Sequence, residues 1–276
     1  MANTSMSTTQ QPSALGRWLA LGLGFAFLYL PILTLIVFSF NDSAMMTSWA
    51  GFSFRWYEAL INDQALLRAA GLSFKVALMT ATAAAALGTW AGYILARKGR
   101  FKGFALYVGL VSAPLVIPEV VLGLSLLLLF VEMDALFGWP GERGLFTIWV
   151  GHTTLCMAFV AVIVQSRVRD LDRSLEEAAL DLGASPLKVF FVITLPLIMP
   201  AVVSGWLLAF TLSLDDVVIS SFLSGPGATL LSPEIFSRVR LGVKPEVNAL
   251  ATVFVLGVAL FVLIVNALQR RQEANR

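Results

Sequence analysis

Long apolar runs recur along the chain and constrain its fold more than any other feature of the sequence. A helix rises about 1.5 Å per residue, so about 20 apolar residues are enough to cross the roughly 30 Å hydrocarbon core of a bilayer. Runs of this length cover residues 18–40, 72–96, 104–130, 145–165, 198–222 and 248–268. The sequence therefore predicts an all-α, polytopic membrane protein with six transmembrane helices.

The composition and the chain ends agree with this fold class. Hydrophobic residues make up 58% of the chain and charged residues only 13%, whereas a soluble domain carries about 25% charged residues. The first run is too long for the apolar core of a signal peptide and no Lys/Arg-rich segment precedes it, so we expect a retained helix. The sequence predicts a disordered tail at residues 1–16 and a single transmembrane domain at residues 17–270. A second tail is predicted at residues 271–276.

The basic residues indicate the orientation in the membrane. With both tails in the cytoplasm, 12 of the 19 Lys and Arg residues lie on the cytoplasmic side, as the positive-inside rule requires. The bias is clearest in the Arg-Lys-Gly-Arg-Phe-Lys turn at residues 97–102. This orientation places the polar stretch 174–196, between the fourth and fifth runs, in the cytoplasm.

The polar stretch 174–196 predicts a first short helix that ends at a glycine. Ser174-Leu-Glu-Glu177 has the spacing of a capping box, in which Ser174 and Glu177 each cap the other's backbone N–H. Gly183 stands where a helix-terminating glycine is expected. The helix ends at a sharp turn, and small residues beside the turn allow a second surface to approach the backbone.

A second short helix is predicted directly after this turn. Ser185 is a suitable N-cap and Pro186 suits the first helical position. The helix body runs to Leu195, and Pro196 is expected to bend the chain back into the membrane. The pattern alone fits two roles equally well: a plain connection between spans, or a pair of helices displayed for a partner.

Three acidic residues are predicted to lie within the membrane. Asp215 and Asp216 occur in the fifth run, and Glu119 follows Pro118 in the third. Charges at this depth are costly and suggest a function, here an acidic lining that receives a cation. Alternatively, the aspartates cap a span that ends early, or they pair with Lys75, Arg238 or Lys244. Pro114 and Pro118 are expected to loosen or break the third helix.

The other conspicuous residues point to packing. A thiolate or histidine metal cluster is excluded because the chain has one cysteine, Cys156, and one histidine, His152. We expect His152 to be a hydrogen-bonded packing residue. Gly88-x-x-x-Gly92 predicts a close helix contact, within this chain or with a second subunit.

Two short helices are expected in the outer loops. Aromatic and aliphatic residues between Phe52 and Ile61 alternate with polar ones, which predicts an amphipathic helix at the membrane interface. Ser232-Pro233 begins another helix, which ends near Gly242.

The chain shows no sign of an enzyme. No phosphate-binding Gly-x-x-x-x-Gly-Lys-Ser/Thr motif occurs in it, and no set of residues suggests catalysis or a metal site. If transport through this chain is driven by ATP, another polypeptide must bind and hydrolyse the nucleotide.

The polar stretch resembles a known motif. Glu177-Ala178-Ala179, three residues, Gly183, nine residues and Ile193-x-Leu195-Pro196 are similar to the EAA motif of bacterial ABC importer permeases. Segments 213–218 and 232–249 resemble the spermidine/putrescine type, and most of all the second permease subunit of putrescine importers. The resemblance extends over nearly all of the chain after Arg17.

This resemblance implies a fold, a coupling site and partners. The fold is that of a type I (MetI-like) ABC importer permease, and residues 174–196 are coupling helices that fit a cleft on an ATPase, with Glu177 facing a basic residue there. The implied coupling residues are Glu177, Ala178, Ala179, Gly183, Ser185, Pro186, Leu195 and Pro196. The implied partners are a sister permease, two ATPase copies, a periplasmic polyamine-binding protein and membrane lipid, but no nucleic acid.

The resemblance also implies what the chain transports. The expected substrate is putrescine, carried across the bacterial inner membrane, with spermidine or another small organic cation as the alternative. ATP and Mg²⁺ are expected on the ATPase, so this chain needs no cofactor of its own.

A different class of function is a self-sufficient channel or secondary transporter that uses the membrane carboxylates as ion sites. The chain shows no sign of the inverted repeats that are common in secondary transporters, and the polar stretch also argues against this class.

Overall fold

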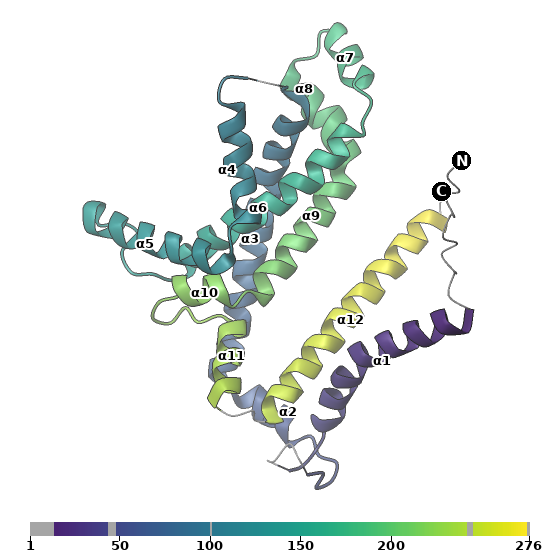
Figure 1. Ribbon diagram of the computed structural model, residues 1–276, viewed down its shortest axis with the longest axis vertical. Coiled ribbons are helices and arrows are strands. Elements are labelled where there is room, and N and C mark those ends of the chain that lie inside the picture. The colour runs from purple at the N-terminus through teal and green to yellow at the C-terminus, as the bar shows by residue number, and fades with distance from the viewer. Residues whose placement is uncertain (1–13, 44–47, 100, 242–244, 275–276) are drawn as a thin grey trace, which may run out of the picture. The chain divides into compact units, whose positions relative to one another are not determined.

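The computed structural model describes residues 14–43, 48–99, 101–241 and 245–274 (Figure 1). The regular elements of the described chain are all helices, with one isolated bridge between Asn41 and Phe52, which confirms the all-α prediction for these residues. It divides into two compact units. One unit holds residues 64–240, and the other combines residues up to 63 with those from 241 onward.

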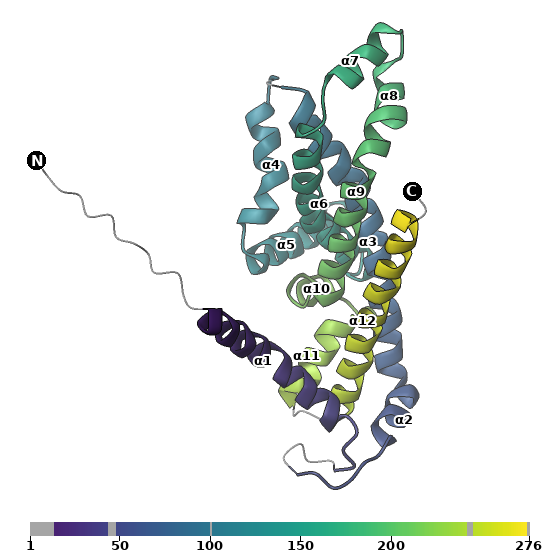
Figure 2. The ribbon, with the colours of Figure 1, turned by 90° about the vertical axis from the view of Figure 1, so that its right-hand side faces the viewer.

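The larger unit contains most of the helices. They are α3 (Gln64–Arg97), α4 (Phe104–Val116), α5 (Glu119–Phe137), α6 (Leu145–Arg169), α7 (Ser174–Asp181), α8 (Pro186–Val189), the π-helical turn η1 (Phe190–Thr194), α9 (Leu195–Asp215), α10 (Val218–Leu223) and α11 (Leu231–Leu241). Figures 1 and 2 show α7 at one end of this unit, and α10 and α11 at the other.

The smaller unit holds α1 (Ala14–Phe38), α2 (Arg55–Asn62) and α12 (Pro245–Ala274). Helix α2 buries Trp56 and Leu60, and the Trp56 indole donates a hydrogen bond to the Asn41 carbonyl at 2.7 Å. A helix is therefore present where residues 52–61 predicted one. Helix extends into both predicted tails, to Ala14 and to Ala274, while residues 1–13 and 275–276 lie outside the described residues.

Five helical stretches of the described chain are long and apolar enough to cross a membrane. They are Trp18–Phe38, Gln64–Arg97, Glu119–Phe137, Leu145–Arg169 and Pro186–Asp215. Two shorter apolar helices cover Phe104–Val116 and Pro245–Gly257. Several membrane-spanning helices are thus present, and their number, six, stays a prediction.

The third apolar run is divided, as its prolines predicted. Helix α4 ends at Val116, Ile117 is extended, and α5 begins at Glu119, so the break falls at Pro118. A proline disfavours helical geometry in the residue before it and offers no N–H to the preceding turn. Pro114 stays inside α4. Helix α5 then turns sharply away from the direction of α4 (Figure 1).

Helices α3, α6 and α9 pack against one another and form the core of the larger unit. The Gly88-x-x-x-Gly92 segment of α3 meets α6 closely. An added Cβ would lie 2.6 Å from Val160 Cβ at Gly88 and 2.5 Å from the Ala161 carbonyl oxygen at Gly92. The predicted close contact is confirmed, and it is made within this chain.

Replacing Gly92 by alanine is expected to lower the free energy of unfolding by about 1–3 kcal/mol, the range for overpacked interiors. The obstacle is the Ala161 carbonyl, which belongs to the backbone and cannot rotate away. Gly71→Ala on the same helix is the matched control, because nothing lies within 4 Å of its added Cβ. Thermal unfolding of the purified protein in detergent compares the two. Equal melting temperatures would contradict close packing at Gly92.

Candidate functional site

The turn between α7 and α8 projects from one end of the larger unit (Figures 1 and 2). Gly183 adopts a left-handed φ of +86° directly after α7. Its N–H donates to the Leu180 carbonyl at 2.9 Å, and the Ala184 N–H donates to the Ala179 carbonyl at 3.0 Å. These two bonds form a Schellman motif, which satisfies carbonyls at the helix end. The predicted role of Gly183 as the terminating glycine is confirmed.

The predicted capping box at the start of α7 is wrong. Ser174 is already the first helical residue, and the preceding Arg173 makes no side-chain cap. Asp172 takes this role instead, because its carboxylate accepts from the Ser174 N–H at 2.9 Å. Hydrogen bonds from Ser174, first from its backbone N–H, hold the pKa of Asp172 below its usual range. The overlooked signal is an aspartate two residues before the helix, a common local backbone acceptor.

Glu176 attaches α7 to the membrane helices. One carboxylate oxygen lies 2.9 Å from Arg97 Nε at the end of α3, with side chains only 8% (Arg97) and 14% (Glu176) exposed. The other oxygen accepts from the Thr194 hydroxyl at 2.6 Å. Arg97 also donates to the Leu171 carbonyl at 3.2 Å. One carboxylate therefore joins α3, α7 and η1, and the sequence reasoning missed it.

The sequence-predicted Glu177 has a different environment. It is exposed, and no hydrogen bond or ion pair joins its carboxylate to another described residue. Ala178 is also exposed, and Leu182 at the tip of the turn is 90% exposed. The turn thus has a fixed base at Glu176 and an open, partly apolar tip.

The start of α8 agrees with its prediction, but its end does not. Ser185 caps the helix by accepting from the Lys188 N–H at 3.4 Å, and Pro186 takes the first helical position. The predicted end at Leu195 and bend at Pro196 are wrong, because helix continues from Pro186 to Asp215. The Leu195 N–H donates to the Phe190 carbonyl across η1. This wider turn restarts the helical register, so Pro196 falls near the start of α9, where a missing N–H costs little.

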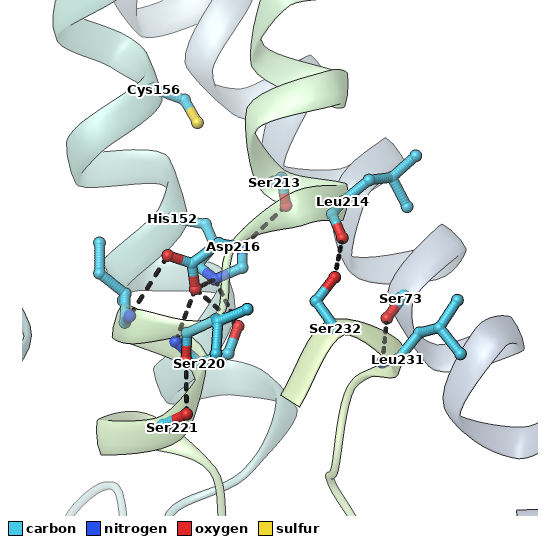
Figure 3. Close-up of polar contacts among 12 residues, drawn as sticks. Ser73, His152, Cys156, Ser213, Leu214, Asp216, Ser220, Ser221, Leu231 and Ser232 are labelled. Atoms are coloured by element: carbon cyan, nitrogen blue, oxygen red, sulfur yellow. Dashed lines mark hydrogen bonds and ion pairs between the residues drawn. The ribbon is translucent and has the colours of Figure 1, made fainter. Parts of the chain in front are cut away.

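Asp216 lies at a break between α9 and α10 and is buried, with its side chain 6% exposed. Its carboxylate accepts from the backbone N–H of Ser220 at 2.7 Å and of Ile219 at 3.3 Å, and from the Ser220 hydroxyl at 2.8 Å (Figure 3). Asp216 therefore caps α10, as the alternative of a span that ends early predicted.

His152 on α6 completes this buried group. Its Nδ1 lies 2.7 Å from the Ser213 hydroxyl, and its Nε2 lies 3.1 Å from the Asp216 carboxylate and 3.0 Å from the Ser220 hydroxyl (Figure 3). The prediction of a hydrogen-bonded packing residue is confirmed. Its acidic partner is brought from 64 residues away by the fold.

The other two predicted pathway residues are exposed. Asp215 is the last residue of α9, and Glu119 is the first residue of α5. Among the basic partners considered for the aspartates, Arg238 pairs with Glu234 at 2.8 Å, and Lys244 lies outside the described residues. Asp215 and Asp216 therefore differ sharply in environment although they are neighbours in sequence.

Asp215 shares one face of α9 with two hydroxyls and the exposed Leu208. Ser204, Thr211 and Asp215 are all exposed and are separated by seven and four residues, which places them on one helix face. The two hydroxyls donate to carbonyls one turn earlier, so their oxygens remain available as acceptors. An exposed strip with a carboxylate at its end is suited to a cation that moves along it.

The chain matches known proteins over most of its length. Residues 88–275 match the family described as binding-protein-dependent transport system inner membrane component. The putrescine transport system permease protein PotI of Escherichia coli (strain K12) is 57% identical over 94% of this chain and 92% of its own length. The spermidine/putrescine transport system permease protein PotC of the same strain is 41% identical over 91% of this chain and 92% of its own length.

Solved structures share the fold. A chain of a bacterial ABC transporter that imports the acidic polysaccharide alginate superposes with a TM-score of 0.74 at 14% identity, covering 97% of this chain and 99% of that one. A chain of the MetNI methionine ABC transporter gives a TM-score of 0.59 at 20% identity over 76% and 95% of the two chains. With the family match and the two permease relatives, this shared fold identifies the chain as a member of the family of inner membrane components of binding-protein-dependent transport systems.

Proposed function

We propose that this chain is a transmembrane permease subunit of an ATP-driven importer that carries putrescine across the bacterial inner membrane. The relative named for putrescine is 57% identical to the chain, and the one named for spermidine/putrescine is 41% identical. The higher identity favours putrescine over spermidine or another small organic cation. ATP and Mg²⁺ bind a separate ATPase subunit, because this chain has no phosphate-binding loop.

The α7–α8 turn, residues 174–189, is where that ATPase docks. The observation that carries this proposal is the 90% exposure of Leu182 at the tip of a turn whose base is fixed by a buried ion pair. An exposed apolar tip suits a hydrophobic cleft on the partner. Because the base is rigid, a displacement of the tip is transmitted to α3 and α9. Glu177, Ala178, Ala179, Gly183, Ser185 and Pro186 form the docking surface, while Leu195 and Pro196 act further along, where the helix register changes.

The basic residues support a cytoplasmic position for this turn and for both chain ends. The end of the larger unit that carries α10 and α11 then faces the periplasm, where a binding protein delivers the substrate. A sister permease forms the other half of the pathway, and a second ATPase copy docks on it.

The pathway face of this chain is the exposed strip on α9, with Asp215 at its periplasmic end and Glu119 as a further carboxylate. Putrescine carries two ammonium groups, and carboxylates replace part of the hydration that these groups lose. Asp216 is buried and bound by His152 and Ser220 within the chain, so it shapes the pathway rather than lining it.

The assembly is tested by reconstituting the complete transporter and this chain alone into liposomes. Uptake of labelled putrescine is expected only with all subunits and internal ATP. Uptake by this chain alone, without ATP, would instead support a channel or secondary transporter.

Asp215→Asn is expected to raise the KM for putrescine uptake about tenfold, the effect of losing roughly 1.4 kcal/mol of cation binding. The substitution removes the charge and keeps the shape of an exposed side chain. Glu58→Gln on α2 removes the same charge from an exposed position with no pathway role and serves as the control. Initial uptake rates over a range of putrescine concentrations give the KM. An unchanged KM in Asp215→Asn would contradict this role.

A further inference from the structure

The break between α9 and α10 has only one local cause in the sequence, the Asp216 side chain that caps α10. No proline or glycine occurs between Gly205 and Gly225, and residues 217–219 are Val-Val-Ile within an apolar run. A helix through this region would satisfy every backbone group. The chain instead leaves helical geometry at Asp216, where φ is −63° and ψ is 127°. A long-range contact from His152 adds to this local cap.

Figure 3 shows the buried group that holds the break. His152 contacts three points of the segment through its two ring nitrogens: Ser213 before the break, Asp216 within it and Ser220 after it. His152, Ser213 and Ser220 are each at most 1% exposed. Buried polar groups of this kind are costly unless each is satisfied, so the arrangement tolerates few alternatives.

The hydrogen-bond partners suggest how the ring is oriented. The Asp216 carboxylate can only accept hydrogen bonds, so Nε2, which lies 3.1 Å from it, is the ring nitrogen that donates to it. Nδ1 forms its hydrogen bond with the Ser213 hydroxyl, which can donate or accept. Both ring nitrogens therefore have a polar partner.

A second brace holds the same end of α9 from the opposite direction. The Ser232 hydroxyl donates to the Leu214 carbonyl at 2.7 Å. The Leu231 N–H, beside it at the start of α11, donates to the Ser73 hydroxyl of α3 at 2.7 Å. The backbone on either side of Asp215 is thus fixed by α3, α6 and α11, while Asp215 itself is exposed.

We propose that His152 is a positioning residue for substrate recognition: by holding Asp216 and Ser213, it fixes the end of α9 so that the Asp215 carboxylate faces the transported cation. The proposal rests on the pathway role of Asp215 proposed above. The two aspartates then have different roles: Asp216 fixes the backbone, and Asp215 contacts the substrate.

The test is a double-mutant cycle between His152 and Asp215 in the complete reconstituted transporter. His152→Leu removes all three ring contacts, whereas His152→Gln keeps an amide near the position of Nε2. We expect His152→Leu to raise the KM for putrescine about tenfold, with the maximum rate and the complex yield changed less than about twofold, and His152→Gln to recover most of the loss. In an Asp215→Asn background, His152→Leu should add less than about a twofold further change.

The possible outcomes distinguish the positioning role of His152 from the pathway role of Asp215. An unchanged KM in Asp215→Asn alone would overturn the pathway role and this inference together. A full-sized His152→Leu effect in the Asp215→Asn background would overturn this inference alone, because His152 would then act independently of Asp215. If His152→Leu does not assemble, Ser213→Ala removes only the Nδ1 contact, and its KM effect, about threefold, must likewise disappear in the Asp215→Asn background.

Discussion

Glu176→Gln is expected to lower the free energy of unfolding by about 3 kcal/mol, the lower end of the range for breaking a buried ion pair on one side, because the Glu176 side chain is 14% exposed. The substitution leaves the Arg97 guanidinium, only 8% exposed, without its counter-charge. Its amide can still accept from the Thr194 hydroxyl, so the loss reports mainly on charge. Thermal and denaturant unfolding of the purified complex in detergent measure the effect.

Two variants make this prediction specific. Glu177→Gln removes the same charge one residue later from an exposed position and is expected to leave stability unchanged. Replacing both Arg97 and Glu176 by methionine should be less destabilising than the sum of the single methionine substitutions, because no buried charge is left unpaired. Equal stability losses in Glu176→Gln and Glu177→Gln would show that the ion pair does not hold α7 in place.

Neighbouring glutamates cannot be told apart from the sequence. Residues 176 and 177 point about 100° apart on a helix, so only one of them can face inward. Which one does so depends on where α3 ends and presents Arg97, almost 80 residues earlier in the chain. The EAA resemblance identified the motif, but the contact that anchors it is long-range and lies one residue before it.

The turn itself was predictable because its signals act locally. Gly183 supplies the left-handed φ, and Ser185 caps a backbone N–H three residues later, so neither depends on distant parts of the chain. The close contact at Gly88 and Gly92 was also readable, since only glycine allows such an approach. The start of α7 was misread because Asp172 and Ser174 are both good local acceptors, and only the geometry shows which one is used.

The helix breaks show the limit of reasoning from local sequence. The break at Pro118 is caused by the proline itself and was therefore predicted. Pro196 suggested a second break, but the π-helical turn before it absorbs the missing hydrogen bond within a continuous helix. The break at Asp216 depends on His152, 64 residues away, and carries no local mark apart from the aspartate. The fold class could therefore be predicted from the sequence. The different environments of Asp215 and Asp216 could be seen only in the structure.

The α7–α8 turn has a fixed base and an exposed tip, so a substitution at the tip can change coupling to the ATPase without changing the stability of the membrane helices. Gly183→Val is expected to reduce co-purification of the ATPase and putrescine uptake at least tenfold, while the membrane helices stay folded. A left-handed φ costs an ordinary residue about 1–2 kcal/mol, and a β-branched residue more. Relief of this strain requires the tip to leave its Schellman geometry, which moves Leu182 and Glu177 away from the surface that the ATPase recognises.

The controls assign the effect to the backbone rather than to bulk. Nothing lies within 4 Å of an added Cβ at Gly183, so the side chain of valine starts in open space. Gly183→Asn should retain most ATPase binding, because asparagine accepts the left-handed conformation. Gly109→Val on α4 adds the same volume to equally open space without a positive φ and should couple normally. Normal ATPase binding and uptake in Gly183→Val would mean that the turn is only a connection between membrane helices, and the ATPase would then have to grip this chain elsewhere.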